Sequence, residues 1–217
     1  MKVTFEIHYV AGNSEELCLV SCNDGKRWTM KRCDGGWWHV TVDVKRAFAY
    51  RYCCVQPNGV RWEEGEAHNL VLHQGCNRLR FVDAWHEVDE QNCYTEPVAT
   101  SLVPEDRVEV EPKPGFALLM LRANGIEPGR QLAVCGDNGY LGYWQPDDAL
   151  SMTSAGNGLW VAQFPLHQGE KVEYKFVLRN LKTGVILWER GENRIVCGSL
   201  TACEATVVRD MVLRLEL

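Results

Sequence analysis

Aromatic residues that could hold a sugar are concentrated in the second half of the chain. Trp144 follows Gly142 in a loop rich in Gly, Asp and Pro, and Trp188 ends a short apolar run just before a charged turn. Aromatic side chains exposed in such places are costly and suggest a binding surface. A pyranose ring has an apolar C–H face, which an aromatic ring can bury for roughly 1–3 kcal/mol. Both tryptophans are therefore candidates for stacking against a sugar.

Polar side chains near the two tryptophans could hold the hydroxyl edge of the same sugar. Lys175 lies in an alternating run, and Glu189 and Asn193 follow Trp188. Ammonium, carboxylate and amide groups are donors and acceptors for hydroxyls. Two rings set at an angle would match the curvature of an α-1,4-glucan better than one flat surface. Taken singly, Lys175 could be a solvated strand lysine and Glu189 the partner of a nearby arginine, so the hypothesis depends on all five residues occurring together.

The chain contains an internal repeat. Residues 30–38 align with 152–160 at an offset of 122, and residues 62–66 align with 188–192 at an offset of 126. A slowly growing offset is typical of two copies of one fold with loops of different length. The first copy lacks about seven residues, and this gap removes the counterpart of the 141–144 loop.

Short period-two runs bounded by Gly, Asn, Asp or Pro fill both copies. In the first copy we expect strands at 2–10, 16–22, 37–44, 48–56, 60–62, 69–73 and 78–82. In the second copy we expect strands at 115–121, 131–136, 159–165, 171–179, 185–188, 194–197 and 205–208. Seven short strands in each copy predict an all-β protein with two immunoglobulin-like antiparallel β-sandwich domains in tandem.

The expected domains are residues 1–86 and 115–217. A proline-containing linker or strap at 87–114 would join them. Trp38 and Trp160 each lie near the start of an alternating strand and are expected in the cores.

Composition excludes several classes of function. The net charge is −6 and no Lys/Arg block occurs, so neither a nucleic-acid surface nor a polybasic membrane patch is expected. No run approaches 18 apolar residues, so no membrane span is predicted. The first residues alternate like a strand rather than a signal peptide, which favours a cytoplasmic protein.

Ten cysteines raise the question of disulfides. Without an export signal, reduced and buried thiols are the better interpretation, since cysteine packs as a small apolar residue. Four of the ten lie inside strand-like runs, namely Cys18, Cys53, Cys54 and Cys135.

Catalytic and metal-binding motifs are not found in the sequence. His73 and Cys76 are wrongly spaced for a phosphatase loop, and neither Cys-x-x-Cys nor His-Glu-x-x-His occurs. Glu189 and Glu192 stand at the end of a short strand, which is a poor host for a glycosidase carboxylate pair. We therefore expect a chain without intrinsic catalysis, metal or cofactor.

The order of motifs in the second copy resembles the starch-binding module of carbohydrate-binding module family 20. The matching residues are Leu141-Gly142-x-Trp144, Met152, Trp160, Glu173-Tyr174-Lys175-Phe176, Trp188-Glu189 and Asn193-Arg194. The resemblance covers residues 115–208 and implies a β-sandwich that binds starch, glycogen and cyclodextrins without catalysis. It assigns the family's first site to Trp144, Lys175, Trp188, Glu189 and Asn193. The aromatic positions of the family's second site fall on Pro128 and Thr153, so that site is not expected.

The first copy resembles the family more weakly. Arg51 stands in place of the lysine, Trp62 and Glu63 are kept, and Ala67 stands where the asparagine would be. Trp28 lies near the gap and could substitute for the missing loop tryptophan. Two hypotheses stay open: weaker glucan binding through these residues, or a degenerate module that packs against its neighbour.

The tandem arrangement resembles the amino terminus of 4-α-glucanotransferases of glycoside hydrolase family 77. It implies that the chain is the non-catalytic front piece of such an enzyme, because a catalytic barrel needs about 250 residues of its own. Its partners would be α-glucan and a C-terminal catalytic domain of the same polypeptide. The alternative is an immunoglobulin-like protein-interaction or structural tandem whose aromatics form a domain or subunit interface.

Overall fold

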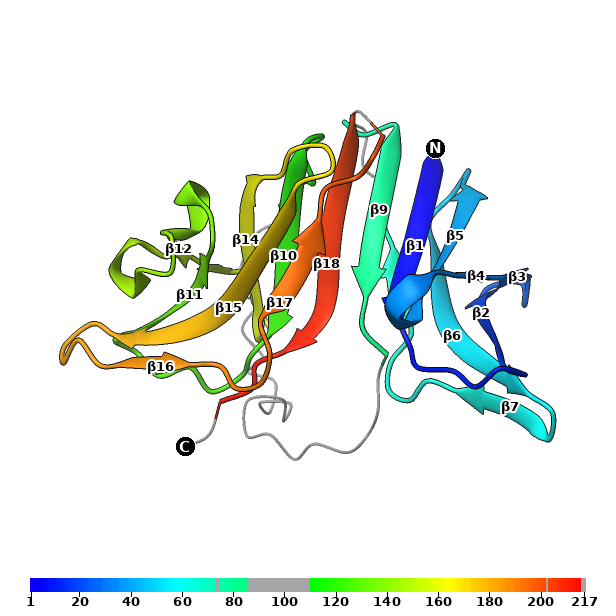
Figure 1. Ribbon diagram of the computed structural model, residues 1–217, viewed down its shortest axis with the longest axis horizontal. Coiled ribbons are helices and arrows are strands. Elements are labelled where there is room, and N and C mark those ends of the chain that lie inside the picture. Colours follow the sequence, from blue (N-terminus) through cyan, green and yellow to red (C-terminus); the bar gives the residue numbers. More distant parts are fainter. Residues whose placement is uncertain (73–74, 86–109, 202, 216–217) are drawn as a thin grey trace. The chain divides into compact units, whose positions relative to one another are not determined.

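The computed structural model describes residues 1–72, 75–85, 110–201 and 203–215 (Figure 1). The chain divides into two compact units, Met1–Glu90 and Gln91–Leu217. Most of the expected linker at 87–114 lies outside the described residues.

The first unit is built from two β-sheets. Its elements are β1 (Lys2–His8), β2 (Glu16–Ser21), β3 (Arg27–Thr29), β4 (Lys31–Arg32), the short 3-10 turn η1 (Asp34–Gly36), β5 (Trp37–Asp43), β6 (Phe48–Gln56), β7 (Gly59–Trp62), β8 (His68–Leu70) and β9 (Arg78–Asp83). One sheet has the order β4-β5-β1-β9. The other has the order β3-β2-β6-β7, with β8 also pairing with β6.

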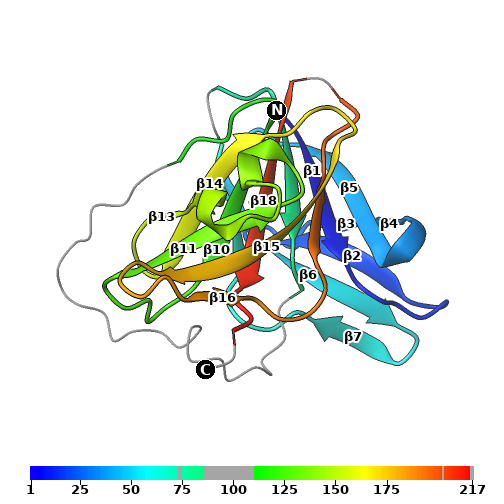
Figure 2. The ribbon, with the colours of Figure 1, turned by 60° about the vertical axis from the view of Figure 1, so that its left-hand side comes forward.

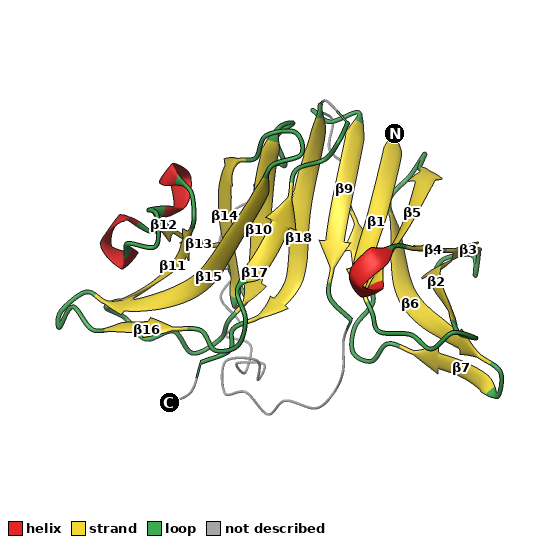
Figure 3. Ribbon diagram, viewed as in Figure 1, coloured by secondary structure: helices red, strands yellow, loops and turns green. Residues whose placement is uncertain are grey.

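The second unit repeats this plan. Its elements are β10 (Phe116–Arg122), β11 (Arg130–Gly136), η2 (Gly139–Leu141), η3 (Pro146–Asp148), β12 (Leu150–Ser151), β13 (Thr153–Ser154), β14 (Leu159–Pro165), β15 (Lys171–Asn180), β16 (Ile186–Trp188), β17 (Arg194–Cys197) and β18 (Glu204–Val212). One sheet has the order β13-β14-β10-β18, and the other β12-β11-β15-β16, with β17 pairing with β15. The two helical turns η2 and η3 stand beside β12 (Figure 3).

Aromatic side chains from alternate strand positions fill the space between the two sheets of the first unit. The Phe5 ring on β1 contacts the Tyr50 ring on β6, with centroids 4.8 Å apart and ring planes at 74°. In the second unit, Tyr174 and Phe176 on β15 are both buried on the inner face. The prediction of an all-β protein with two β-sandwiches is confirmed.

One strand pair in each unit departs from the expected antiparallel arrangement. β1 pairs in parallel with β9, and β10 pairs in parallel with β18. The first and last long strands of each unit therefore run side by side in the same direction. A period-two pattern gives no information on which strands become neighbours.

The predicted core tryptophans occupy equivalent positions in the two units. Trp38 is buried, and its indole Nε1 donates a hydrogen bond to the Tyr9 carbonyl at 3.0 Å. Trp160 is half-buried, and its Nε1 donates to the Ala123 carbonyl at 3.1 Å. The prediction is confirmed for Trp38, whereas Trp160 lies at the edge of the core. The same indole contact in both units extends the sequence repeat to the structure.

The four strand cysteines are free and buried, as expected. Burial raises the pKa of the Cys53 thiol to about 11, and burial also raises the pKa of Cys135. Cys22 and Cys197, by contrast, are exposed. Since the thiolate is the reactive form, the buried and exposed cysteines should differ in reactivity.

We expect iodoacetamide at pH 8 to alkylate Cys22 and Cys197 in the native protein and to leave Cys53 and Cys135 unmodified. Peptide mass spectrometry would measure the extent of labelling at each position. Labelling in urea is the control and should modify all four residues. Native labelling of Cys53 at the rate of Cys22 would contradict the burial of this thiol.

Candidate functional site

The structure brings Trp144 and Trp188 together on the surface of the second unit. Their ring centroids are 6.4 Å apart and their ring planes are inclined by 36°. Trp188 is 38% exposed and Trp144 is half-buried. The two rings thus form an angled aromatic surface that a ligand can reach.

Trp144 lies in the loop between β11 and β12, whose backbone is unusual. Tyr143 and Trp144 have φ values of 47° and 61°, in the left-handed region that disfavours residues that carry a Cβ atom. Each such residue costs roughly 1–2 kcal/mol. Gly142, with φ of 80°, has no room for a side chain, because a Cβ atom there would lie 2.7 Å from the Asp148 carbonyl carbon.

Hydrogen bonds hold this loop in its strained conformation. The Trp144 N–H donates to the Gly136 carbonyl at 2.7 Å, where β11 ends. The Asn138 side chain accepts a bond from the Leu141 N–H at 3.1 Å and caps η2. Figure 2 shows η2 and η3 in front of the sheet that contains β11 and β15. The tryptophan is therefore held by its backbone rather than by its side chain alone.

Trp188 and Lys175 lie on the same outer face of the second sheet. Trp188 is the register partner of Val177, which is two residues from Lys175 on β15. Alternate residues of a strand share a face, so the ammonium group and the indole ring are neighbours. The Lys175 Nζ donates to the carbonyls of Glu189 and Gly191 at 3.2 and 2.5 Å. Lys175 thereby ties down the turn that follows Trp188.

Glu189 is buried, with 2% of its surface exposed. One carboxylate oxygen accepts the Phe176 N–H at 2.9 Å, and Arg194 donates to both oxygens at 2.9–3.0 Å. The structure therefore shows the alternative noted from the sequence, in which Glu189 is the partner of an arginine. A direct contact from Glu189 to a sugar hydroxyl stays a prediction.

Asn193 is exposed and is held by a residue that sequence reasoning missed. Its amide nitrogen donates to a Glu173 carboxylate oxygen at 3.2 Å. The other Glu173 oxygen accepts from Lys171 Nζ at 2.9 Å. The Lys171 ammonium and the Asn193 amide hold the pKa of Glu173 below its ordinary value. Strand alternation in the sequence could have identified Glu173, because it puts Glu173 on the same face as Lys175.

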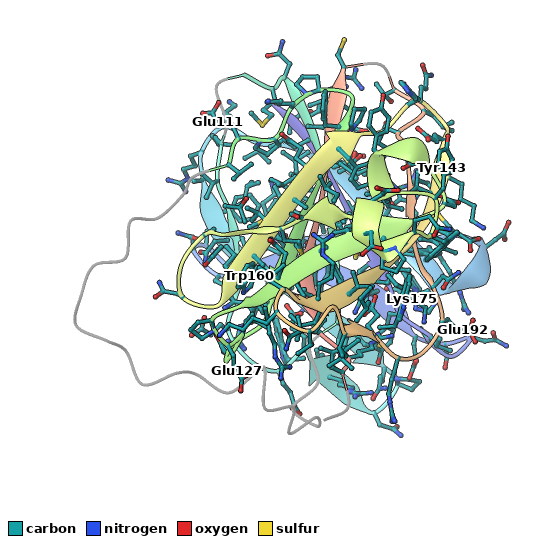
Figure 4. The ribbon with its side chains drawn as sticks, turned by 90° about the vertical axis from the view of Figure 1, so that its left-hand side faces the viewer. Glu111, Glu127, Tyr143, Trp160, Lys175 and Glu192 are labelled. Atoms are coloured by element: carbon teal, nitrogen blue, oxygen red, sulfur yellow. The ribbon has the colours of Figure 1, made fainter. Side chains whose placement is uncertain are left out.

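The five expected site residues are thus adjacent along β15, β16 and the two loops. Figure 4 shows Tyr143, Lys175 and Glu192 toward one side of the second unit and Trp160 toward the other. Tyr143 is exposed and flanks Trp144, so it can extend the aromatic surface. Stacking and hydrogen bonding are the chemistry this surface offers.

The described residues contain no group of three or more His, Cys, Asp and Glu placed to hold a metal ion. Within the same residues, no helix has the length and hydrophobicity needed to span a membrane. Of the two carboxylates once considered as a pair, Glu189 is buried against Arg194, whereas Glu192 is exposed.

The first unit reproduces the framework of this site. Trp62 on β7 pairs with Cys53 on β6, and Arg51 lies two residues before Cys53 on the same strand. Arg51 donates to the Gly65 carbonyl at 2.6 Å, just as Lys175 does to Gly191.

Glu63 in the first unit repeats the role of Glu189. It is 2% exposed and accepts the Tyr52 N–H at 2.7 Å. Its second oxygen lies 2.8 Å from His68 Nε2, where the second unit has Arg194.

Trp28 does not replace the missing loop tryptophan, and that hypothesis is wrong. Trp28 pairs with Leu19, which pairs with Tyr52 on the inner face of the sheet. Its ring packs against Phe48, with centroids 5.8 Å apart. Trp62 lies on the opposite, outer face, because its partner Cys53 is one residue on from Tyr52. Among the described residues, Trp62 has no second tryptophan beside it.

We expect Glu189→Gln to lower the free energy of unfolding by about 2–4 kcal/mol. The amide still accepts the Phe176 N–H but leaves the Arg194 guanidinium without a counter-charge in a largely buried setting. Urea denaturation would measure the change. Glu192→Gln, at an exposed position next to the same turn, is the matched control and should change stability by less than about 0.5 kcal/mol. Equal midpoints for the two variants would contradict the structural role of Glu189.

Comparison with known proteins matches part of the second unit to a family model and 72% of the chain to a curated relative. The chain is similar to the 4-alpha-glucanotransferase DPE2 of Oryza sativa subsp. japonica, with 27% identity over 181 residues. The alignment covers 72% of this chain and 19% of the relative, so the chain spans only a small part of that protein's length.

Solved structures to which the chain is similar include a glucoamylase and a carbohydrate-binding module. A glycoside hydrolase family 15 glucoamylase from Hypocrea jecorina has 22% identity and a TM-score of 0.42, covering 48% of this chain and 18% of that one. The family 20 module of a maltotetraose-forming amylase from Pseudomonas saccharophila STB07 has 22% identity and a TM-score of 0.37, covering 43% of this chain and 99% of the module.

The family match carries more weight, because it falls on the unit that holds the paired tryptophans. Residues 120–206 match the model of the starch binding domain CBM_20. This segment runs from β10 to β18 and includes both Trp144 and Trp188. Residues 120–206, within the second unit, are therefore similar to the starch binding domain of the CBM_20 family.

Proposed function

We propose that the outer face of the second unit binds α-1,4-glucan, such as starch, glycogen or maltodextrin, without catalysing a reaction. The observation that carries this proposal is the Trp144–Trp188 pair, with ring planes inclined by 36° and centroids 6.4 Å apart. Successive glucose units of a curved α-1,4-glucan present their apolar faces at an angle to one another. Two inclined rings fit that shape, whereas one flat surface would fit a straight chain.

Some polar residues around the rings can contact the sugar, and others hold those residues in place. Lys175 and Asn193 lie beside the rings and can reach hydroxyl groups at the sugar edge. Glu189 and Glu173 hold the turn and the asparagine amide in place. Because the surface is shallow and the sugar edge stays in water, each site should bind weakly on its own.

The biological context is a proposal of the same kind. We infer that the chain is the glucan-binding part of a larger 4-α-glucanotransferase, with the catalytic domain elsewhere in the same polypeptide. Support comes from the similarity to the rice enzyme and from the repeated framework of the two units. Tethering would raise the local concentration of glucan at the catalytic domain. A cytoplasmic location fits the free cysteines of the described residues, since a reducing compartment keeps thiols unpaired.

For the first unit we propose a degenerate module. It keeps Arg51, Trp62 and Glu63 but has no loop tryptophan, and Trp28 lies on the other face of the sheet. A single ring on this surface supplies only half of the stacking area.

We expect Trp188→Ala to abolish measurable binding of β-cyclodextrin while circular dichroism and the melting temperature stay unchanged. The indole is exposed, so its loss removes stacking area without opening a core cavity. Isothermal titration calorimetry would measure the association. Leu200→Ala, at an exposed position in the turn between β17 and β18, is the matched control and should bind as the unaltered chain does. Undiminished affinity, or loss of folding, would contradict the assignment of Trp188.

We expect the titration of β-cyclodextrin into the unaltered chain to give one site per chain, and Trp62→Ala to leave that value unchanged. Two sites, with one lost in Trp62→Ala, would show that the first unit binds glucan and is not degenerate. No heat at millimolar ligand, together with no retention on insoluble starch, would overturn the proposed function. A stable dimer that protects both site tryptophans and ignores maltoheptaose would favour a protein interface.

A further inference from the structure

We propose that Arg179 is a positioning residue that holds the 137–149 loop, and with it Trp144, at the angle required for stacking. Its effect on glucan affinity rests on the proposed function. Its effect on the orientation of Trp144 does not, and can be observed without any ligand.

Arg179 makes three hydrogen bonds to the segment that follows Trp144. Its Nη1 donates to the carbonyls of Pro146 and Asp147, each at 3.1 Å. Its Nη2 donates to the Ser151 hydroxyl at 2.8 Å. The Nε atom is buried and has no partner within the described residues. The half-buried guanidinium group thus lies against the loop and is bound chiefly to its backbone.

The loop covers a small apolar cluster on the outer face of the second sheet. The cluster contains Ala133, Cys135 and Val177 from the sheet and Ala149 from the end of the loop. Arg179 lies on this face, two residues beyond Val177 on β15. It therefore forms the polar border of the area on which the loop rests.

The backbone of the loop explains why such a residue is needed. Tyr143 and Trp144 both have positive φ values, and such conformations persist only where the surroundings impose them. The bonds of Trp144 to Gly136 and of Leu141 to Asn138 fix the first half of the loop. Arg179 fixes the second half. Without it, the second half of the loop would lose three side-chain hydrogen bonds and would be held by its own backbone turns, by Ala149 and by the pairing of β12 with β11.

The first unit supplies an internal comparison. Trp188 pairs with Val177, and Trp62 pairs with Cys53, so Val177 is equivalent to Cys53. Arg179 is then equivalent to Val55, which packs against the apolar cluster of its own sheet. The first copy has neither the loop nor the arginine. Within one chain, the arginine occurs where there is a loop to hold.

The test compares Arg179→Met and Arg179→Lys with the unaltered protein by two readouts. The first is the far-ultraviolet exciton couplet in circular dichroism, which arises when two indole rings lie as close as those of Trp144 and Trp188. The spectrum of Trp144→Phe, which lacks one of these indoles, serves as the reference without the couplet. The second is β-cyclodextrin affinity by calorimetry. Arg122→Met, an exposed position on β10, is the matched control.

We expect Arg179→Met to lose most of the couplet and to bind β-cyclodextrin at least about tenfold more weakly. Arg179→Lys should restore part of both, because one ammonium group can satisfy only some of the three acceptors. Arg122→Met should change neither. If Arg179→Met does not fold, Arg179→Lys and Ser151→Ala replace it, with a reduced couplet expected in both.

An unchanged couplet in these variants would overturn the proposal, whatever happens to affinity. Weaker binding with an intact couplet would mean that Arg179 acts on the ligand itself rather than through Trp144. If the unaltered chain does not bind β-cyclodextrin, the proposed function fails, and the couplet alone still decides the role of Arg179.

Discussion

A buried glutamate carboxylate at the end of a short edge strand fixes the framework of the candidate site. Glu189 accepts the backbone N–H of Phe176 and pairs with Arg194, while 2% of its surface is exposed. β16 cannot slide along β15 without breaking this pair, and an unpaired buried charge costs several kcal/mol. Trp188 directly precedes Glu189, and Lys175 binds the Glu189 carbonyl. The position of the stacking ring is therefore set by an interaction that need not touch a sugar.

The same carboxylate holds the corresponding strand in the first unit, but the surface around it has changed. Glu63 caps Tyr52 and pairs with His68. The framework is thus common to both units, whereas the loop that carries Trp144 is present only in the second. In the proposed function, glucan binding depends on that loop, which is held by backbone hydrogen bonds and by Arg179. A repeated sandwich therefore does not imply a repeated function.

The sequence predicted the fold well, because period-two alternation reports directly which face of a strand is buried. The ends of β6 and β14 were predicted correctly, and β1, β2 and β5 were predicted to within about two residues. The Trp144–Trp188 pair was also foreseeable, since Trp144 stands in a loop rich in Gly, Asp and Pro and Trp188 ends a strand just before a charged turn. Which strands pair with one another could not be predicted from this pattern, and the two parallel pairs, β1–β9 and β10–β18, were missed.

Features that depend on register or on through-space contacts could not be read from the sequence. Trp28 pairs with Leu19, so its side chain lies on the inner face of the sheet. A shift of the pairing by one residue would have placed it on the outer face. The burial of Glu189 depends on Arg194 reaching across the turn. The contacts of Arg179 are with backbone carbonyls, which carry no residue-specific signal.

We propose that a glucan binds against two of the eight tryptophans and against no others. An NMR titration of the indole N–H signals with maltoheptaose tests this most directly, because each indole gives its own resonance. We expect the signals of Trp144 and Trp188 to shift on binding, while those of the other six, Trp28, Trp37, Trp38, Trp62, Trp85 and Trp160, stay in place. Shifts at Trp62 or at the core tryptophans, with Trp144 and Trp188 unmoved, would contradict this proposal.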